Sequence, residues 1–166
     1  MNKSSEMPKI IEVRELSNKP KVIKWSAEAQ ELKALAKRLN VLSVDDLTAE
    51  VKLQKGDLIQ VNGHFDAHIT QSCVVTGQPI KEAVSDSFEE FFCLHSRHDV
   101  PIDLDMESPD IEAIEDGRID VGELVIEYLI LGLNPFPRKS DIPLVVAGDE
   151  EKRENPFAVL EKLKKN

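Results

Sequence analysis

Cysteine is scarce in this sequence, because only Cys73 and Cys93 occur among its 166 residues. Two cysteines cannot form the disulfide framework that stabilises many small secreted domains. No apolar run approaches the ~18 residues that a membrane-spanning helix needs. The first residues also lack the apolar stretch of a secretory signal. These absences favour a globular protein in the cytoplasm, without membrane contact.

Motifs of catalysis and cofactor binding are missing as well. The sequence contains no phosphate-binding loop, no nucleophile elbow, no dinucleotide fingerprint and no helical metal motif. We therefore expect no enzymatic activity, no cofactor and no small-molecule substrate. This leaves the binding of a partner as the expected activity.

Positive charge is sparse in one part of the chain. The formal net charge is −10, and residues 99–127 alone carry 11 acidic side chains against one basic side chain. Residues 1–55 have a net charge of +3, and residues 128–166 have a net charge of +1. Because the acidic stretch repels a polyanion such as RNA, RNA contact is compatible only with the two ends of the chain.

A long alternation of apolar and polar residues extends from Leu58 to Leu94. Its period is that of strands with one buried face, and Gly77 and Pro79 supply a turn in its middle. Shorter alternations occur at residues 10–16 and 47–53, and a hairpin needs other elements to cover its apolar face. We predict an α+β fold, in which an antiparallel sheet of at least four strands is built around this hairpin and packed with two main helices.

Two segments have the pattern of helices. The first is expected to begin at a cap on Ser26 and to stop at Asn40. Its apolar stripe consists of Leu32, Leu35, Ala36 and Leu39. The second is expected to run from Asp120 to Leu133, with Asp120 and Glu123 as a capping box.

Three basic residues, Lys33, Lys37 and Arg38, lie off the stripe of the first helix, and Trp25 precedes them. One interpretation is a basic face that contacts RNA phosphates while Trp25 stacks on a base. The other is a solvated helix face with Trp25 in the core, which is favoured because three positive charges are few for RNA binding. Since all three lie off the stripe, we expect their joint replacement by glutamate to leave the fold intact.

Histidine spacing raises the question of a metal site. His64 and His68 are four residues apart, but on a strand they stand ~13 Å apart and cannot share one ion. We therefore expect two surface histidines. His95 and His98 beside Cys93 form a weaker alternative.

Residues 99–120 are acidic and have little periodicity, so we expect a solvated loop. The segment Asp103-Leu-Asp-Met-Glu107 resembles the start of a calcium loop, but Ser108 and Ile114 stand where that loop needs glycine and a bidentate acid. Carboxylates also bind Mg²⁺, which gives an alternative function from another class, a metal-dependent nuclease. Its residues are Asp103, Asp105, Glu107 and Asp110.

The end of the chain is expected to follow a single α+β domain over residues 1–146, as a charged linker and amphipathic tail over residues 147–166. Asn155 and Pro156 fit a helix start. The tail stripe consists of Phe157, Leu160 and Leu163, with Lys164 beside it. Ordering about ten residues costs ~1–2 kcal/mol each, which exceeds what these few apolar side chains contribute. The tail must therefore dock on its own domain or on another molecule, and we predict that Phe157, Leu160, Leu163 and Lys164 bind at least partly to a partner.

Three segments together resemble the YceD family of large-subunit ribosomal RNA accumulation proteins. They are the hairpin tip Cys73-Val-Val-Thr-Gly-Gln-Pro79, the second helix with its following prolines, and the tail Asn155-Pro-Phe-Ala-Val-Leu160 with Leu163 and Lys164. The resemblance spans roughly residues 58–166. Many members of the family carry Cys-x-x-Cys at the hairpin tip, whereas Thr76 holds the second position here. A zinc site built on that pair is therefore not expected.

The resemblance implies a bacterial, non-catalytic adaptor that supports 23S ribosomal RNA synthesis, processing or accumulation, and so ribosome biogenesis. The implied partner is a protein or ribonucleoprotein of large-subunit ribosomal RNA metabolism. Direct RNA binding and the metal-dependent nuclease remain as alternatives.

Overall fold

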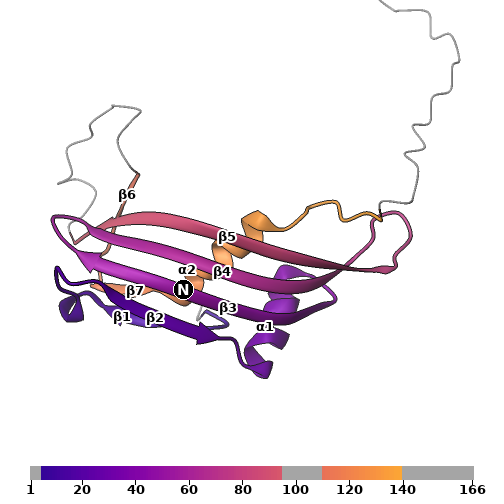
Figure 1. Ribbon diagram of the computed structural model, residues 1–166, viewed down its shortest axis with the longest axis horizontal. Helices are drawn as coiled ribbons and strands as arrows, with labels where there is room; N and C mark the ends of the chain where they lie inside the picture. Colours follow the sequence, from indigo (N-terminus) through magenta and orange to yellow (C-terminus); the bar gives the residue numbers. More distant parts are fainter. Residues whose placement is uncertain (1–4, 95–109, 140–166) are drawn as a thin grey trace, which may run out of the picture.

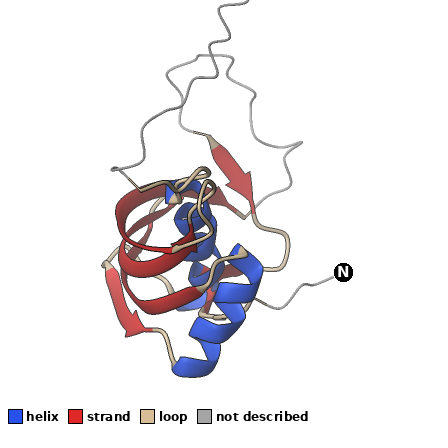
Figure 2. Ribbon diagram, turned by 90° about the vertical axis from the view of Figure 1, so that its right-hand side faces the viewer, coloured by secondary structure: helices blue, strands red, loops and turns tan. Residues whose placement is uncertain are grey.

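Two helices lie on the same side of a curved five-stranded sheet, and this arrangement confirms the α+β class (Figures 1 and 2). The computed structural model describes residues 5–94 and 110–139. No helix in these ranges has the length and hydropathy that crossing a membrane requires.

The sheet combines neighbours in sequence with one distant strand. Its order is β2 (Lys21–Ser26), β3 (Ser43–Lys55), β4 (Ile59–Ser72), β5 (Pro79–Cys93) and β6 (Ile111–Ala113). The first four strands are antiparallel to their neighbours, whereas β6 pairs in parallel with Phe91–Cys93. A separate pair joins β1 (Ile10–Glu12) to β7 (Arg118–Asp120). The sheet is therefore mixed rather than purely antiparallel.

The hairpin of β4 and β5 forms the longest ladder, from the pair Ile59 and Phe92 to the pair Ser72 and Pro79. Every second residue of β4 is buried and the residues between are exposed or half-buried, as the period of a strand dictates. Gly77, with φ of 71°, supplies the left-handed backbone conformation of the turn.

The helices have the ends that their sequences favour, with one difference. Asn40 adopts a left-handed conformation and ends α1 (Ala29–Leu39), as predicted. The cap of α1 is Glu28, in a capping box with Glu31, and the prediction of Ser26 as the cap is wrong. Ser26 still belongs to β2, where it pairs with Thr48, so the helix begins only after the strand has ended.

Asp120 caps α2 (Val121–Gly132), as predicted. Its Oδ1 accepts hydrogen bonds from the N–H groups of Gly122 and Glu123 at 3.1 and 3.2 Å, and from the N–H group of Lys9 at 2.9 Å. The same carboxylate therefore starts the helix and holds the N-terminal segment against it.

Two predictions about secondary structure need correction, and one strand was missed. The strand expected over residues 10–16 ends at Glu12 and continues as a 3₁₀ turn, η1 (Val13–Glu15). The strand β2 was not predicted. The acidic stretch expected to be a loop contains β6 and β7, because its backbone pairs with β5 and β1, which are distant in sequence.

The core lies between the sheet and the two helices. Its fully buried side chains include Leu35 from α1, Phe65 from β4, and Ile126 and Leu129 from α2. The stripe predicted for the first helix is confirmed, since its other members pack against the same core.

Candidate interaction surface

Exposed apolar side chains gather at the hairpin tip and in the chain that follows α2. Val74 and Val75 at the tip are each 57% exposed, and Phe136 is 74% exposed. We call these three residues the tip surface. On the last turn of α2, Ile130 and Leu131 are exposed as well. Exposed apolar groups of this kind mark sites of interaction with other molecules.

Hydrogen bonds fix the tip surface in place. The segment after α2 runs along the molecule to the hairpin tip (Figure 1). There the N–H group of Val74 donates to the carbonyl of Pro137 at 2.9 Å, and Lys139 Nζ donates to Gln78 Oε1 at 2.6 Å. Two segments about 60 residues apart in sequence therefore form one preorganised surface, which lowers the entropic cost of binding.

An Asx turn directs the chain at Phe136. The side-chain oxygen of Asn134 accepts a hydrogen bond from the N–H group of Phe136 at 3.0 Å. The carbonyl of Asn134 in turn accepts a bond from Gln71 on β4 at 3.3 Å. These contacts tie Asn134 to the sheet, while the Phe136 ring remains exposed to solvent.

Cys73 lies buried beneath this tip. Hydrogen bonds from the Thr76 hydroxyl, and then from the N–H group of Lys139, lower the pKa of Cys73 from 9.0 to about 6. These hydrogen bonds favour the thiolate form of the sulfur over the thiol. Thr76, three residues after Cys73, donates its hydroxyl hydrogen bond to this sulfur from within the same turn.

His64 and His68 lie exposed on the outer face of β4, as predicted. His64 contacts Asp66 at 3.2 Å, while His68 contacts Asp46 at 2.9 Å, and this bond to Asp46 raises the pKa of His68. The two rings thus have different partners. Within the described ranges, no group of three or more histidine, cysteine or acidic residues is arranged to hold a metal ion.

Trp25 and Arg38 do not form a basic face with the two lysines. Trp25 is half-buried against the core, and its indole N–H donates to the sulfur of Met7 at 3.3 Å. The Arg38 side chain, only 25% exposed, donates to Glu6 at 2.6 Å and to Glu123 at 2.8 Å. Hydrogen bonding to Glu123 and to Glu6 raises the pKa of Arg38.

The assignment of Arg38 to a solvent-facing basic surface is therefore wrong. The position lies off the apolar stripe of α1, but the N-terminal segment and the start of α2 both approach it there. Lys33 and Lys37 are exposed, as predicted.

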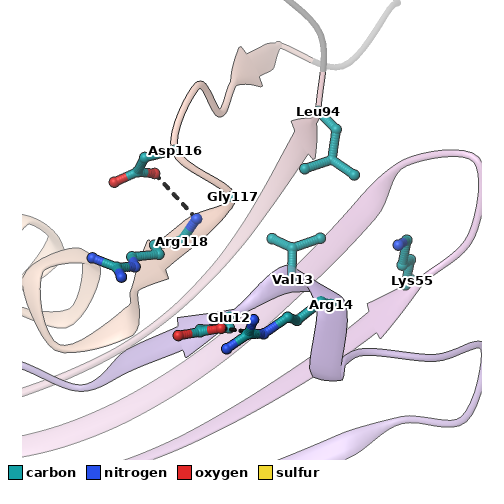
Figure 3. Close-up of a pocket in the computed structure, with 8 residues that line it drawn as sticks. All are labelled: Glu12, Val13, Arg14, Lys55, Leu94, Asp116, Gly117 and Arg118. Atoms are coloured by element: carbon teal, nitrogen blue, oxygen red, sulfur yellow. Dashed lines mark hydrogen bonds and ion pairs between the residues drawn. The ribbon is translucent and has the colours of Figure 1, made fainter.

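A hollow of about 420 Å³ lies between η1, the end of β3 and the turn before β7 (Figure 3). Three of its residues are basic, and Figure 3 shows Lys55 and Arg118 on opposite sides of Val13. Arg14 forms an ion pair with Glu12, and Asp116 accepts a hydrogen bond from the N–H group of Arg118. Because the charges are mixed, this hollow has no clear preference for an anion.

Several predicted site residues lie outside the described residues. They are Phe157, Leu160, Leu163 and Lys164 of the tail, Asp103, Asp105 and Glu107 of the acidic stretch, and His95 and His98. The division into residues 1–146 and 147–166 also stays a prediction. Asp110 is exposed and immediately precedes β6.

Sequence reasoning missed the tip surface. The only local signals were two consecutive valines beside a turn, and a phenylalanine between two prolines. Neither signal shows that the segments lie together, because that contact depends on the path of the chain after α2.

Comparison with known families identifies one match. The model described as Large ribosomal RNA subunit accumulation protein YceD matches residues 61–164, which is more than half of the chain. The match begins within β4 and includes the hairpin tip, β5, α2 and the tail, whereas β2, α1 and β3 precede it. Searches of curated proteins and of solved structures give no significant match.

Proposed function

The chain belongs to the YceD family of large ribosomal RNA subunit accumulation proteins. We propose that it acts as a non-catalytic factor that binds a protein or ribonucleoprotein partner. The family description supports a role in accumulation of the large ribosomal RNA. The binding of a partner is our own inference. We also propose that the protein is cytoplasmic and acts as an adaptor in 23S ribosomal RNA production.

The tip surface is the observation that supports binding. It lies within the matched residues, it is apolar, and two hydrogen-bonded segments hold it in place. A ring such as that of Phe136 supplies the large apolar anchor on which protein interfaces depend. We propose that the tail residues Phe157, Leu160, Leu163 and Lys164 make a second contact with the same partner.

The two rival functions have weaker support. Direct RNA binding through the first helix now rests on Lys33 and Lys37, because Arg38 is engaged with two carboxylates and Trp25 packs inward. The nuclease alternative rests on carboxylates that lie mostly outside the described residues, with Asp110 as the exception.

Capture of partners from a bacterial extract, with and without ribonuclease, tests the proposal. We expect the tagged full chain to retain a defined protein partner after ribonuclease treatment. The double variant V75S/F136S should lose that partner, whereas V22S, which changes a similarly exposed residue on β2, should keep it. Complete loss of the partner with ribonuclease alone would instead indicate direct RNA binding.

Cleavage assays address the nuclease alternative. Purified protein should leave labelled ribosomal RNA intact in the presence of Mg²⁺. Cleavage that disappears in a variant with Asp103, Asp105, Glu107 and Asp110 changed to asparagine or glutamine would contradict the proposal.

A further inference from the structure

A groove of about 760 Å³ runs along α1, on the side away from Arg38. Ala29, Leu32 and Ala36 lie along it at helical spacing, so one face of the helix lines the groove from the first turn to the last. A helix of this length extends about 16 Å, which is enough for roughly three turns of a second helix. Leu42 contributes to the opposite wall.

Apolar residues predominate in the walls of this α1 groove, and backbone hydrogen bonds hold one wall in position. Leu32 and Ala36 are half-buried, and Leu42 is 57% exposed. The wall beyond the helix is fixed by two backbone bonds, from the N–H group of Val41 to Ala36 at 3.1 Å and from that of Leu42 to Thr70 at 2.9 Å. The groove is therefore preformed in the free chain.

Two free positive charges line the groove. Lys33 and Lys37 are exposed and one turn apart, and within the described ranges neither forms an ion pair. By contrast, Lys9 pairs with Glu31 at 3.2 Å, and Arg38 pairs with Glu6 and Glu123. In a chain with a net charge of −10, the two lysines form a local excess of positive charge, which favours an acidic partner.

The lining favours a peptide over RNA. Single-stranded RNA is bound by stacking its bases on aromatic rings, and none of the residues that line this groove is aromatic. The tail of the same chain is also disfavoured, because Lys162, Lys164 and Lys165 would approach Lys33 and Lys37.

We propose that the α1 groove binds an acidic amphipathic helix of a partner protein. Apolar side chains at every third or fourth position of that helix would contact Leu32, Ala36 and Leu42, and two carboxylates one turn apart would pair with Lys33 and Lys37. The groove precedes the residues that the family model matches. The groove shares none of its lining residues with the tip surface, and this proposal is independent of the proposed function.

The test is selection of helical peptides on the full chain. The probe is a displayed library of 14-residue helices with a fixed leucine stripe and random flanking positions. We expect enrichment of sequences with two acidic residues one turn apart. A synthetic selected peptide should bind more tightly than the same peptide with its two acidic residues replaced by lysine. Enrichment of basic or neutral flanks would overturn the proposal.

Matched variants locate the contact. Ala36→Trp, which fills the groove, and Leu42→Asp should each weaken the selected peptide by about ten-fold or more. K33E/K37E should do the same, whereas K19E/K52E, which changes two exposed lysines elsewhere, should not. Thermal unfolding checks the fold of each variant, and Leu42→Asp keeps the test decisive if Ala36→Trp is unstable.

Two competitors complete the experiment. Displacement of the selected peptide by a synthetic peptide of residues 153–166 would assign the groove to the chain's own tail and overturn the proposal. Binding of labelled single-stranded RNA that falls with K33E/K37E but not with Ala36→Trp would assign the lysines to RNA, and would also overturn it.

Discussion

Single residues determine how neighbouring elements pack, and Gly63 in β4 is the clearest case. A Cβ atom at this position would lie 2.1 Å from the ring of Phe88. That ring stacks on Tyr128, with centroids 4.5 Å apart and planes inclined by 8°. The absence of a side chain at Gly63 therefore makes room for the contact between β5 and α2.

Replacing Gly63 by alanine should lower the free energy of unfolding by about 1–3 kcal/mol, because Phe88 is buried and cannot move without disturbing Tyr128. Urea unfolding followed by circular dichroism measures the effect. Gly56→Ala is the control, since its nearest atom would be 3.7 Å away. Equal losses in the two variants would contradict this role of Gly63.

Cys73 should ionise with a pKa near 6, because Thr76 and the N–H group of Lys139 donate hydrogen bonds to its sulfur. Ultraviolet absorbance of the thiolate, titrated against pH, measures this value. Thr76→Val removes the hydroxyl donor and should raise the pKa of Cys73. Titration of Cys93→Ser isolates the signal, because Cys73 is then the one thiol left in the sequence. A midpoint near 9 in the original protein would show that these donors do not act on the sulfur.

The same titration affects stability in a defined direction. The pKa of Cys73 is about 6 in the folded chain, against 9.0 for an unperturbed thiol, so the unfolded state binds more protons between these values. The contribution of Cys73 to stability is therefore complete above pH 9 and is lost as the pH falls to 6. In Cys73→Ser, the free energy of unfolding should lack this rise between pH 6 and 9.

At the scale of the elements, ion pairs connect one side of α1 to two other segments of the chain. Arg38 joins α1 to the N-terminal segment through Glu6 and to α2 through Glu123. Because the side chain is largely covered, these bonds are less screened than those of an exposed ion pair.

Arg38→Gln should lower the free energy of unfolding by about 1–3 kcal/mol, since it removes the positive charge that the carboxylates of Glu6 and Glu123 share. K33Q/K37Q removes more charge from the same helix and should have little effect. Thermal and urea unfolding compare the stabilities of the two variants.

Because Arg38 pairs with two carboxylates, we expect joint replacement of Lys33, Lys37 and Arg38 by glutamate to destabilise the fold, in contrast to the expectation from the sequence. A stable triple variant would support the earlier expectation.

The molecule as a whole has two regions suited to contact, the tip surface and the α1 groove, besides the tail. Among the described residues, the sheet, α1 and α2 together bury one apolar core. A stable domain that presents separate contacts fits an adaptor.

Deletion of residues 155–166 should therefore change the free energy of unfolding by little, while it abolishes capture of the partner. Urea unfolding and capture from extract measure the two effects. A variant with Phe157, Leu160 and Leu163 changed to serine should match the deletion, because the apolar stripe is what binds. Unfolding of the truncated chain would show that the tail is a structural part of the domain, and undiminished capture would show that it does not bind.

Several features of the fold followed from the sequence alone. The alternation in β3, β4 and β5, the stripe of α1, the cap at Asp120 and the stop at Asn40 all depend on residues within a few positions of one another. Local backbone geometry sets these periods and caps, so the chain itself carries the signal.

Other features were decided only by the tertiary structure. The strands β6 and β7 exist because distant backbone segments pair with them, and Arg38 pairs with two carboxylates from other parts of the chain. The tip surface and the α1 groove likewise need segments that no local pattern brings together. Contacts of this kind depend on how the elements dock, because packing and hydrogen bonding between distant residues leave no period in the sequence.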